Sequence, residues 1–536
     1  MHPNNRDQFS IEIFMFFSNI FSKRPHSSLS LGIVIFLLCG NIMGNPAHAA
    51  KKDTKKESAK VENSFENRMA VFQEVFAALD KGEKTVAVDN LISILDNPAH
   101  SYYHVDAYAQ LGTLLEELSL PYSALLSYQK ALATDASRTT SSVSKAIELA
   151  EKIGDTAVLE SMFTNMIQLD VDAQLRSRIA YFAAREAFRR GDLGPAFGLL
   201  QMVQANDPDF PEAQNLQGVI MSQQDRAPSA IAPFQIAYQK GLENKKSAKF
   251  QDAVLMNMAR AYFTAKNYPQ AVVYYNQVPR SSFYWADAQF EKGWGYYHMQ
   301  DMNGLLGTLH TLNSPFFQDE YYAEAELLRI YGLINMCKFE EANRDLDHFA
   351  TRFTPQKESL AMVAAKSPKE IFALMRKEVQ GTSTEFPQSV VRKFAEEDRL
   401  LDSIRSVEAA EQEISRLQSL QGNKFSTLGI AWLTERKDAI EQSEGQRIQQ
   451  KLSALSMQLQ TMLVALDISR LDILDLQTQM LNRAAELGKM EEAKRQVSRS
   501  KRRKKNEVVW DYQGEYWADE VGYYQFTVKS ECPASM

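Results

Sequence analysis

The chain has 536 residues, of which 45% are hydrophobic and 24% charged, and its formal net charge is −7. A mildly acidic balance disfavours nucleic acid as a partner, because nucleic-acid-binding domains cluster Lys and Arg. The length predicts two or three domains.

Residues 1–49 have the organisation of a secretory signal peptide. Lys23 and Arg24 form a positive region, and the apolar run 31–39 follows it. This run is shorter than the roughly 20 residues that span a bilayer. Ala47-His48-Ala49 has the small-x-small pattern that signal peptidase accepts. We expect cleavage after Ala49 and export to the periplasm, with an uncleaved anchor as the alternative.

Residues 50–65 are charged near their start and are expected to be a flexible lead-in. The exported part of the chain retains two cysteines, Cys337 and Cys532. In an oxidising compartment they could pair. Cys337 falls in an apolar helical stretch, where it could equally be a small buried hydrophobe. We favour free thiols and keep the disulfide as the alternative.

A pattern of small and apolar residues recurs between positions 66 and 355. Apolar spacings of three and four within it are typical of amphipathic helices. Small residues such as Gly112, Ala184 and Gly218 let the two helices of a hairpin approach closely, and the last two are 34 positions apart. Because one hairpin cannot bury its apolar face alone, the pattern predicts that about eight hairpins stack.

These positions resemble the tetratricopeptide repeat (TPR) family. The match is good at 104–136, 180–208 and 251–279, and it is weaker at 141–175 and 281–320. The resemblance implies an all-α, right-handed solenoid over 66–355 with a concave groove that binds peptides or protein segments. It also implies no catalytic activity. The chain has no phosphate-binding loop, GxSxG or HExxH motif, so we expect no enzyme, cofactor or metal site.

The C-terminal half changes in composition. Residues 356–389 predict a linking helix with a polar exit, and 390–506, rich in Glu, Gln, Lys, Arg, Leu and Ala, predict a coiled-coil helical arm. Its helices are expected at 390–420, 425–444 and 447–505, with a turn at 421–423.

The third arm helix carries an apolar seam whose members alternate by three and four, which is coiled-coil spacing. We expect the seam to pack on the 390–444 helices of the same chain, with a second chain as the alternative. Its members are Leu452, Leu455, Leu459, Met462, Leu466, Ser469, Ile473, Leu476, Met480, Arg483, Leu487 and Met490.

A basic cluster ends the arm: Lys501, Arg502, Arg503, Lys504 and Lys505. It is interpreted as a solvated helix end, or as a contact with anionic lipid or an acidic partner. The tail 507–536 is aromatic and β-prone, and a lone two-stranded ribbon is marginal by itself. We therefore expect the tail to be a docking element for another surface, with a lid on this same chain as the alternative.

Aromatic residues are the candidates for partner binding, because Tyr and Trp supply contact area at low entropic cost. For those in the repeats, a place in the core is the competing interpretation. The candidates are Tyr262, Tyr275, Trp285, Trp294, Tyr297, Trp510, Tyr516, Trp517, Tyr523 and Tyr524.

An export signal, tandem repeats, an arm and the segment GEYWADEVGYY together resemble periplasmic TPR proteins of bacterial gliding-motility and envelope machineries. The resemblance implies a scaffold or adaptor that binds protein partners in a cell-envelope machine, with gliding motility as the example. The alternatives are a self-assembling structural coiled-coil protein and an accessory subunit of a cell-wall or polysaccharide enzyme.

Overall fold

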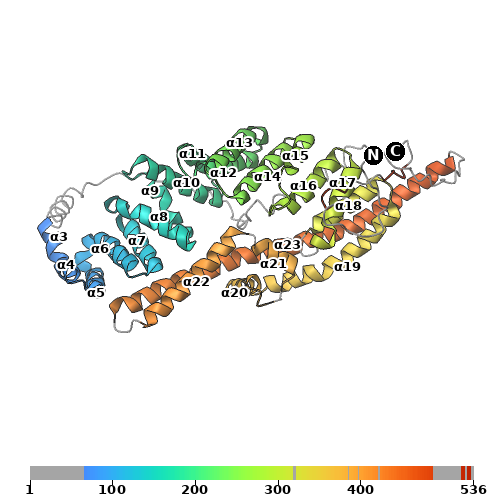
Figure 1. Cartoon of the computed structure of the whole chain (residues 1–536). Helices are drawn as coiled ribbons and strands as arrows, with labels where there is room; N and C mark the ends of the chain where they lie inside the picture. The colour runs from blue at the N-terminus through green and yellow to red at the C-terminus, as the bar shows by residue number, and fades with distance from the viewer. Residues whose placement is uncertain are drawn as a thin grey trace, which may run out of the picture. The chain divides into compact units, whose positions relative to one another are not determined.

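The computed structural model describes residues 65–317, 322–383, 386–395, 397–419, 423–486, 521–524 and 528–532. Within these ranges every regular element is a helix, and none of the described residues forms a strand (Figure 1). The all-α prediction is therefore confirmed, whereas the β-prone tail is not observed as strands in its described part. The expected signal peptide lies outside the described residues, as does the lead-in apart from Phe65.

The chain divides into two compact units. Unit 1 contains the described residues up to Asp209, together with Pro368–Arg376 and Glu397–Ile448. Unit 2 contains Phe210–Ser367, Lys377–Glu396 and the described residues from Gln449 onward. Each unit thus combines repeat hairpins with segments from the C-terminal half of the sequence.

Unit 1 begins with helices that pair with their neighbours in the chain. α4 packs on α5, α6 on α7, α8 on the short helix η3 (Thr156–Leu159) that precedes α9, and α10 on α11. The helices are α3 (Phe65–Val71), α4 (Gln73–Asp80), α5 (Lys84–Leu95), α6 (His104–Glu117), α7 (Pro121–Asp135), α8 (Thr140–Ile153), α9 (Glu160–Met166), α10 (Ala173–Arg190) and α11 (Leu193–Leu200).

Unit 2 continues the same pairing. α12 packs on α13, α14 on α15, α16 on α17, and α18 on α19. The helices are α12 (Phe210–Gln223), α13 (Ala227–Glu243), α14 (Ala248–Thr264), α15 (Tyr268–Tyr275), α16 (Trp285–His298), α17 (Met302–Leu312), α18 (Ala323–Asn335) and α19 (Phe339–Ala364).

The turn inside each of these hairpins contains a residue with positive φ. Such a residue reverses the chain directly after a helix, and glycine is its usual occupant. Only three of these eight turn residues in the described hairpins are glycine, so most of the turns cannot be recognised in the sequence by a glycine. The residues are Gly82, Ser119, Gly154, Gly191, Asp225, Lys266, Gln300 and Cys337.

Two of the predicted close approaches are present. A Cβ atom on Gly112 would lie 2.6 Å from the Tyr128 ring, and one on Gly218 would lie 2.5 Å from the Phe234 ring. Both aromatic rings are almost completely buried. The small residues therefore allow large side chains of the second helix to fill the core, as the sequence pattern predicted.

The remaining helices are α20 (Pro368–Val379), α21 (Gln388–Ala395), α22 (Asp398–Ser419) and α23 (Lys424–Glu486). The predicted turn at 421–423 falls between α22 and α23. The predicted break near 444–447 is wrong, because α23, which is 63 residues long, continues through these positions without interruption. In unit 1, α22 packs on α7 and α8, and Ser406 Oγ donates to Ile153 O over 3.3 Å.

The seam of α23 is buried in unit 2. Leu452 and Leu459 are fully buried, and Ser456 Oγ donates to Lys357 O of α19 over 3.2 Å. Arg470 pairs with Asp347 of α19 at 2.5 Å. The seam residues from Leu452 to Ile473 are buried, and this stretch of α23 bonds to α18 and α19. The sequence predicted that it packs on the 390–444 helices; of these, α21 contributes one contact, because Lys451 Nζ lies 5.8 Å from the Phe394 ring centroid. The difference from the prediction arises because α19 extends well past the end of a normal repeat helix and offers a long partner surface.

Candidate protein-interaction site

A polar pocket of about 490 Å³ opens in unit 2 beside α18 and α19. Leu312 at the end of α17, with Pro315 and Phe317 from the segment that follows it, forms an apolar wall. The opposite wall is charged. Its residues are Glu326 and Arg329 from α18, and Asp345, His348 and Arg352 from α19.

The charged wall alternates acids and bases. Arg352 pairs with Glu326, and His348 Nδ1 lies 3.8 Å from the second oxygen of the same carboxylate. Burial raises the pKa of Glu326, while Arg352 and His348 act to lower it. Arg329 Nε lies 3.4 Å from Asp345 Oδ2. A guanidinium group carries five N–H donors, so Arg329 and Arg352 each have donors that these ion pairs do not occupy.

Two polar atoms of the pocket lack hydrogen bonds. Ser314 is 1% exposed, and its Oγ has no hydrogen-bond partner among the described residues. Asp345 Oδ2 also has no hydrogen bond, although it forms the ion pair with Arg329. Buried polar atoms are normally hydrogen-bonded, because leaving one unpaired costs about 1–3 kcal/mol. The pocket therefore offers a buried hydroxyl and partly used charges to a polar ligand.

The aromatic candidates from the repeats do not line this pocket. Tyr275 and Trp294 are buried, and Tyr275 Oη donates to Glu291 over 2.9 Å. Tyr262 stacks on Tyr274 with 5.1 Å between ring centroids. Tyr297 is half-buried, and its ring packs edge-on against Trp294. Trp285 is buried and stacks on Phe317 at 5.7 Å, so it lies behind the apolar wall.

The tail candidates fall into two groups. Tyr523 is 76% exposed, and Tyr524 packs edge-on against His310 at 4.9 Å. Trp510, Tyr516, Trp517 and the basic cluster 501–505 lie outside the described residues.

Cys337 and Cys532 form a disulfide. The preference for free thiols was therefore wrong. Cys337 is not inside a helix but in the α18–α19 turn, with φ +56°, and Cys532 reaches it there. A disulfide-bonded cysteine is no nucleophile.

A second polar region of unit 2 lies around α16. Glu291 accepts three hydrogen bonds from the Arg260 guanidinium. Lys292 is 5% exposed, and burial lowers its pKa to about 8; its Nζ donates to Asn276 Oδ1 over 3.1 Å. Burial raises the pKa of Glu324 to about 7 against the opposing effect of Lys393. Arg260 is exposed and Glu324 is half-buried, whereas Lys292 is buried. All of these groups are used in polar contacts between neighbouring helices of the stack.

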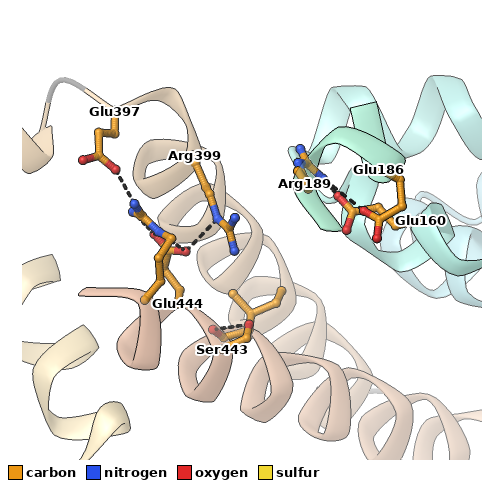
Figure 2. A network of polar contacts seen from close by, with 9 residues as sticks. Glu160, Glu186, Arg189, Glu397, Arg399, Ser443 and Glu444 are labelled. Carbon is orange, nitrogen blue, oxygen red and sulfur yellow. Dashed lines mark hydrogen bonds and ion pairs between the residues drawn. The ribbon is translucent and has the colours of Figure 1, made fainter. Parts of the chain in front are cut away.

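Unit 1 carries its own ion-pair networks, which Figure 2 shows from close by. Arg447 bridges Glu397 and Glu444, and Arg399 Nε lies 3.1 Å from Glu444. Burial raises the pKa of Glu444, but Arg447 and Arg399 outweigh this effect and lower it. The network joins the start of α22 to the middle of α23.

On α9 and α10, Arg189 pairs with Glu160 and lies 4.0 Å from Glu186 (Figure 2). Every carboxylate in these two networks lies near an arginine. No set of three or more His, Cys, Asp or Glu side chains among the described residues is placed to hold a metal ion. Across the described ranges, no helix combines the length and apolar character that crossing a membrane requires.

Stacked helical hairpins define the chain as a helical-repeat protein. No family model and no curated protein matches the sequence. Solved structures similar to it include pilF of Pseudomonas aeruginosa, with 15% identity over 41% of this chain and 97% of that one (TM-score 0.29). A tetratricopeptide repeat protein of Parabacteroides merdae has 15% identity over 53% and 91% (TM-score 0.26). A Rap protein complexed with competence and sporulation factor has 11% identity over 67% and 99% (TM-score 0.28).

These three TM-scores are low, so the assignment to helical-repeat proteins rests on the hairpins themselves. The pocket was not predicted from the sequence. Arg329 and His348 occupy ordinary polar positions of α18 and α19, and only the packing of the two helices brings them together. The segment NSPFF (313–317) interrupts the repeat spacing and was the sign of the pocket that the sequence offered. It supplies Ser314 and part of the apolar wall.

Proposed function

We propose that the chain is a non-catalytic scaffold that binds a segment of a partner protein, and that the polar pocket of unit 2 holds part of that segment. The observation that carries the proposal is that the pocket is lined both by the buried Ser314 hydroxyl, which has no hydrogen-bond partner among the described residues, and by the Arg329 guanidinium, which has N–H donors left over. A carboxylate of the partner would complement Arg329, because charge-assisted hydrogen bonds to arginine are among the stronger ones.

The helical hairpins support this function physically. Rigid, consecutively packed helices fix the pocket side chains before binding, which reduces the entropic cost of association. The self-assembling alternative is less favoured, because the seam proposed to join two chains is buried on α18 and α19 of the same chain.

We further propose that the protein works in the periplasm as part of a cell-envelope machine. The Cys337–Cys532 disulfide supports an oxidising compartment, since disulfides are rare in reducing ones. The leader pattern of residues 1–49 supports export. Gliding motility as the specific setting rests only on the resemblance of the sequence to such proteins.

The test uses a photo-crosslinking amino acid at position 348, whose native side chain is 69% exposed. We expect it to capture one partner in cells, which mass spectrometry identifies. Purified partner should then bind the Arg329→Ala chain roughly tenfold more weakly than the wild type. Arg190→Ala is the matched control, because Arg190 forms an exposed pair with Asp192 in unit 1. Equal binding by wild type and Arg329→Ala would refute the role of the pocket.

A further inference from the structure

The described part of the tail lies on unit 2, and we call it the C-terminal strap (residues 521–524 and 528–532). Its backbone N–H groups donate to the repeats at three points along its length. The bonds are Gly522 N to Thr311 Oγ1 at 3.1 Å, Val528 N to Asn303 Oδ1 at 3.0 Å, and Glu531 N to Met336 O at 2.9 Å.

These three contacts use only the peptide backbone of the strap. Repeated main-chain hydrogen bonds to an extended segment are a general mode of peptide recognition, in which pockets for particular side chains add specificity. Thr311 and Asn303 both belong to α17, and Met336 O lies at the end of α18, so two neighbouring hairpins of unit 2 hold the backbone of the strap. The repeat surface therefore binds a peptide segment through its main chain.

The side chains of the strap add selectivity. Val521 is 1% exposed, and Tyr524 packs on His310. Gly522 has φ +97°, and a Cβ atom there would lie 2.5 Å from the Trp285 ring. This position therefore excludes every residue larger than glycine. The surface selects an aliphatic residue, then glycine, then any residue, then an aromatic one.

The far end of the strap is fixed covalently. Cys532 is joined to Cys337, and Glu531 pairs with Lys338 of the same α18–α19 turn. A covalent link keeps the strap at high effective concentration over its site. Any free peptide must compete with this tethered occupant. Its apparent affinity is therefore the intrinsic affinity multiplied by the fraction of sites that the strap leaves open.

We propose that this surface of α16, α17 and the α18–α19 turn is a peptide-binding site, occupied by the chain's own strap in the oxidised state. Its external ligand is a partner segment with the same aliphatic–Gly–x–aromatic pattern. Reduction of the Cys337–Cys532 disulfide opens the site. The idea deepens the proposed scaffold function, but it concerns a surface separate from the charged wall of the pocket.

The redox step needs a dithiol reductant. Its thiolate attacks one sulfur of the disulfide, and a mixed disulfide forms and then resolves. The Cys337–Cys532 bond breaks, each sulfur gains one electron and one proton, and the dithiol becomes a disulfide. The hydrogen bonds and the Glu531–Lys338 pair then hold the strap only reversibly.

The probe is a fluorescein-labelled peptide with the sequence of residues 518–532, in which serine replaces Cys532 so that no mixed disulfide can form. Anisotropy measures its binding to the full chain before and after treatment with a dithiol. We expect roughly tenfold or greater tightening on reduction. The Cys532→Ser chain should bind the peptide equally well without any reductant.

Two matched variants test the site itself. A peptide with valine in place of Gly522 should not bind the reduced chain, because of the Trp285 ring. The Asn303→Leu chain should bind the parent peptide several-fold more weakly, while Asn313→Leu, in the adjoining segment, should not. Circular dichroism checks that each chain remains folded.

Equal binding to the oxidised and reduced chains, or tight binding of the valine peptide, would overturn the proposal. Dimerisation of the reduced chain without peptide, seen by light scattering, would also overturn it, since the occupant would then be the strap of a second copy. The scaffold function at the pocket is tested independently, by the binding measurement on the Arg329→Ala chain.

Discussion

The carboxylate of Glu413 accepts hydrogen bonds from the backbone N–H groups of Tyr122 and Ser123, at 2.9 and 2.7 Å. Glu413 belongs to α22, and the two donors belong to the first turn of α7. The first N–H groups of a helix have no partner inside that helix, and a carboxylate there also complements the helix dipole. A residue 291 positions away in sequence thus caps a repeat helix.

Replacing Glu413 by Ala should destabilise the protein by about 1–3 kcal/mol, because two buried N–H groups would lose their acceptor. Urea unfolding followed by circular dichroism measures the change. Gln412→Ala on the same helix is the control, since Gln412 is exposed. If the two variants lost the same stability, the capping role of Glu413 would be disproved.

Gly218→Ala should destabilise unit 2, whereas Gly198→Ala should be neutral or slightly stabilising. The new Cβ atom at 218 would overlap the Phe234 ring, whereas one at 198 meets nothing within 4 Å. In open space, Ala is the better helix former by up to about 1 kcal/mol. Thermal unfolding of both variants gives opposite shifts of Tm if the close approach is real, and shifts of equal sign if it is not.

Glu324 should make stability depend on pH. Burial, with a smaller contribution from Glu291, raises its pKa from 4.5 to about 7, while Lys393 and Gln458 act in the other direction. Because the folded-state pKa is the higher one, the stabilisation is fully present below pH 4.5 and is lost as the pH rises through about 7.

The Glu324→Gln variant tests this dependence, because it retains a hydrogen-bonding side chain and cannot ionise. Denaturant midpoints between pH 4.5 and 8 should decline less steeply for this variant than for the wild type. Glu340→Gln, an exposed substitution in the same unit, should keep the wild-type slope. An unchanged slope for Glu324→Gln would contradict the shifted pKa.

Lys292→Met should stabilise the protein near neutral pH by about 1–3 kcal/mol. Burial lowers the pKa of this lysine to about 8, so the folded protein carries a poorly solvated ammonium group at pH 7. Methionine has a similar length and no charge to desolvate. Chemical unfolding at pH 7 and pH 9.5 provides the check, and the gain should shrink at the higher pH; a loss of stability at pH 7 would show that the bond to Asn276 dominates.

Leu459→Asp should unfold part of unit 2, because Leu459 is fully buried on α23. Met457→Asp is the matched control on the same helix turn, and Met457 is 71% exposed. A large loss of the helical signal is expected for the first variant only. If Leu459→Asp instead stayed folded and merely converted a dimer to a monomer in light scattering, the seam would be intermolecular.

The sequence alone determined the repeated helical hairpin. The small residues at Gly112 and Gly218 and the apolar spacings of three and four are local patterns, since each hairpin is built from residues close together in the chain. The turn at 421–423 could be read for the same reason, because it interrupts two long amphipathic stretches. Cys337 was misassigned, because positive φ at a non-glycine residue leaves no compositional trace.

Only the tertiary structure decided where α22, α23 and the strap pack. Three sets of contacts join residues about 100 to 300 positions apart in the sequence. Glu413 caps the start of α7, the α23 seam packs on α19, and Cys532 bonds to Cys337. Such contacts have no periodicity, because they depend on which surfaces the folded hairpins leave open rather than on the spacing of neighbours. The pocket around Arg329 and the strap site on α17 arise in the same way, from side chains that only the packed helices bring together.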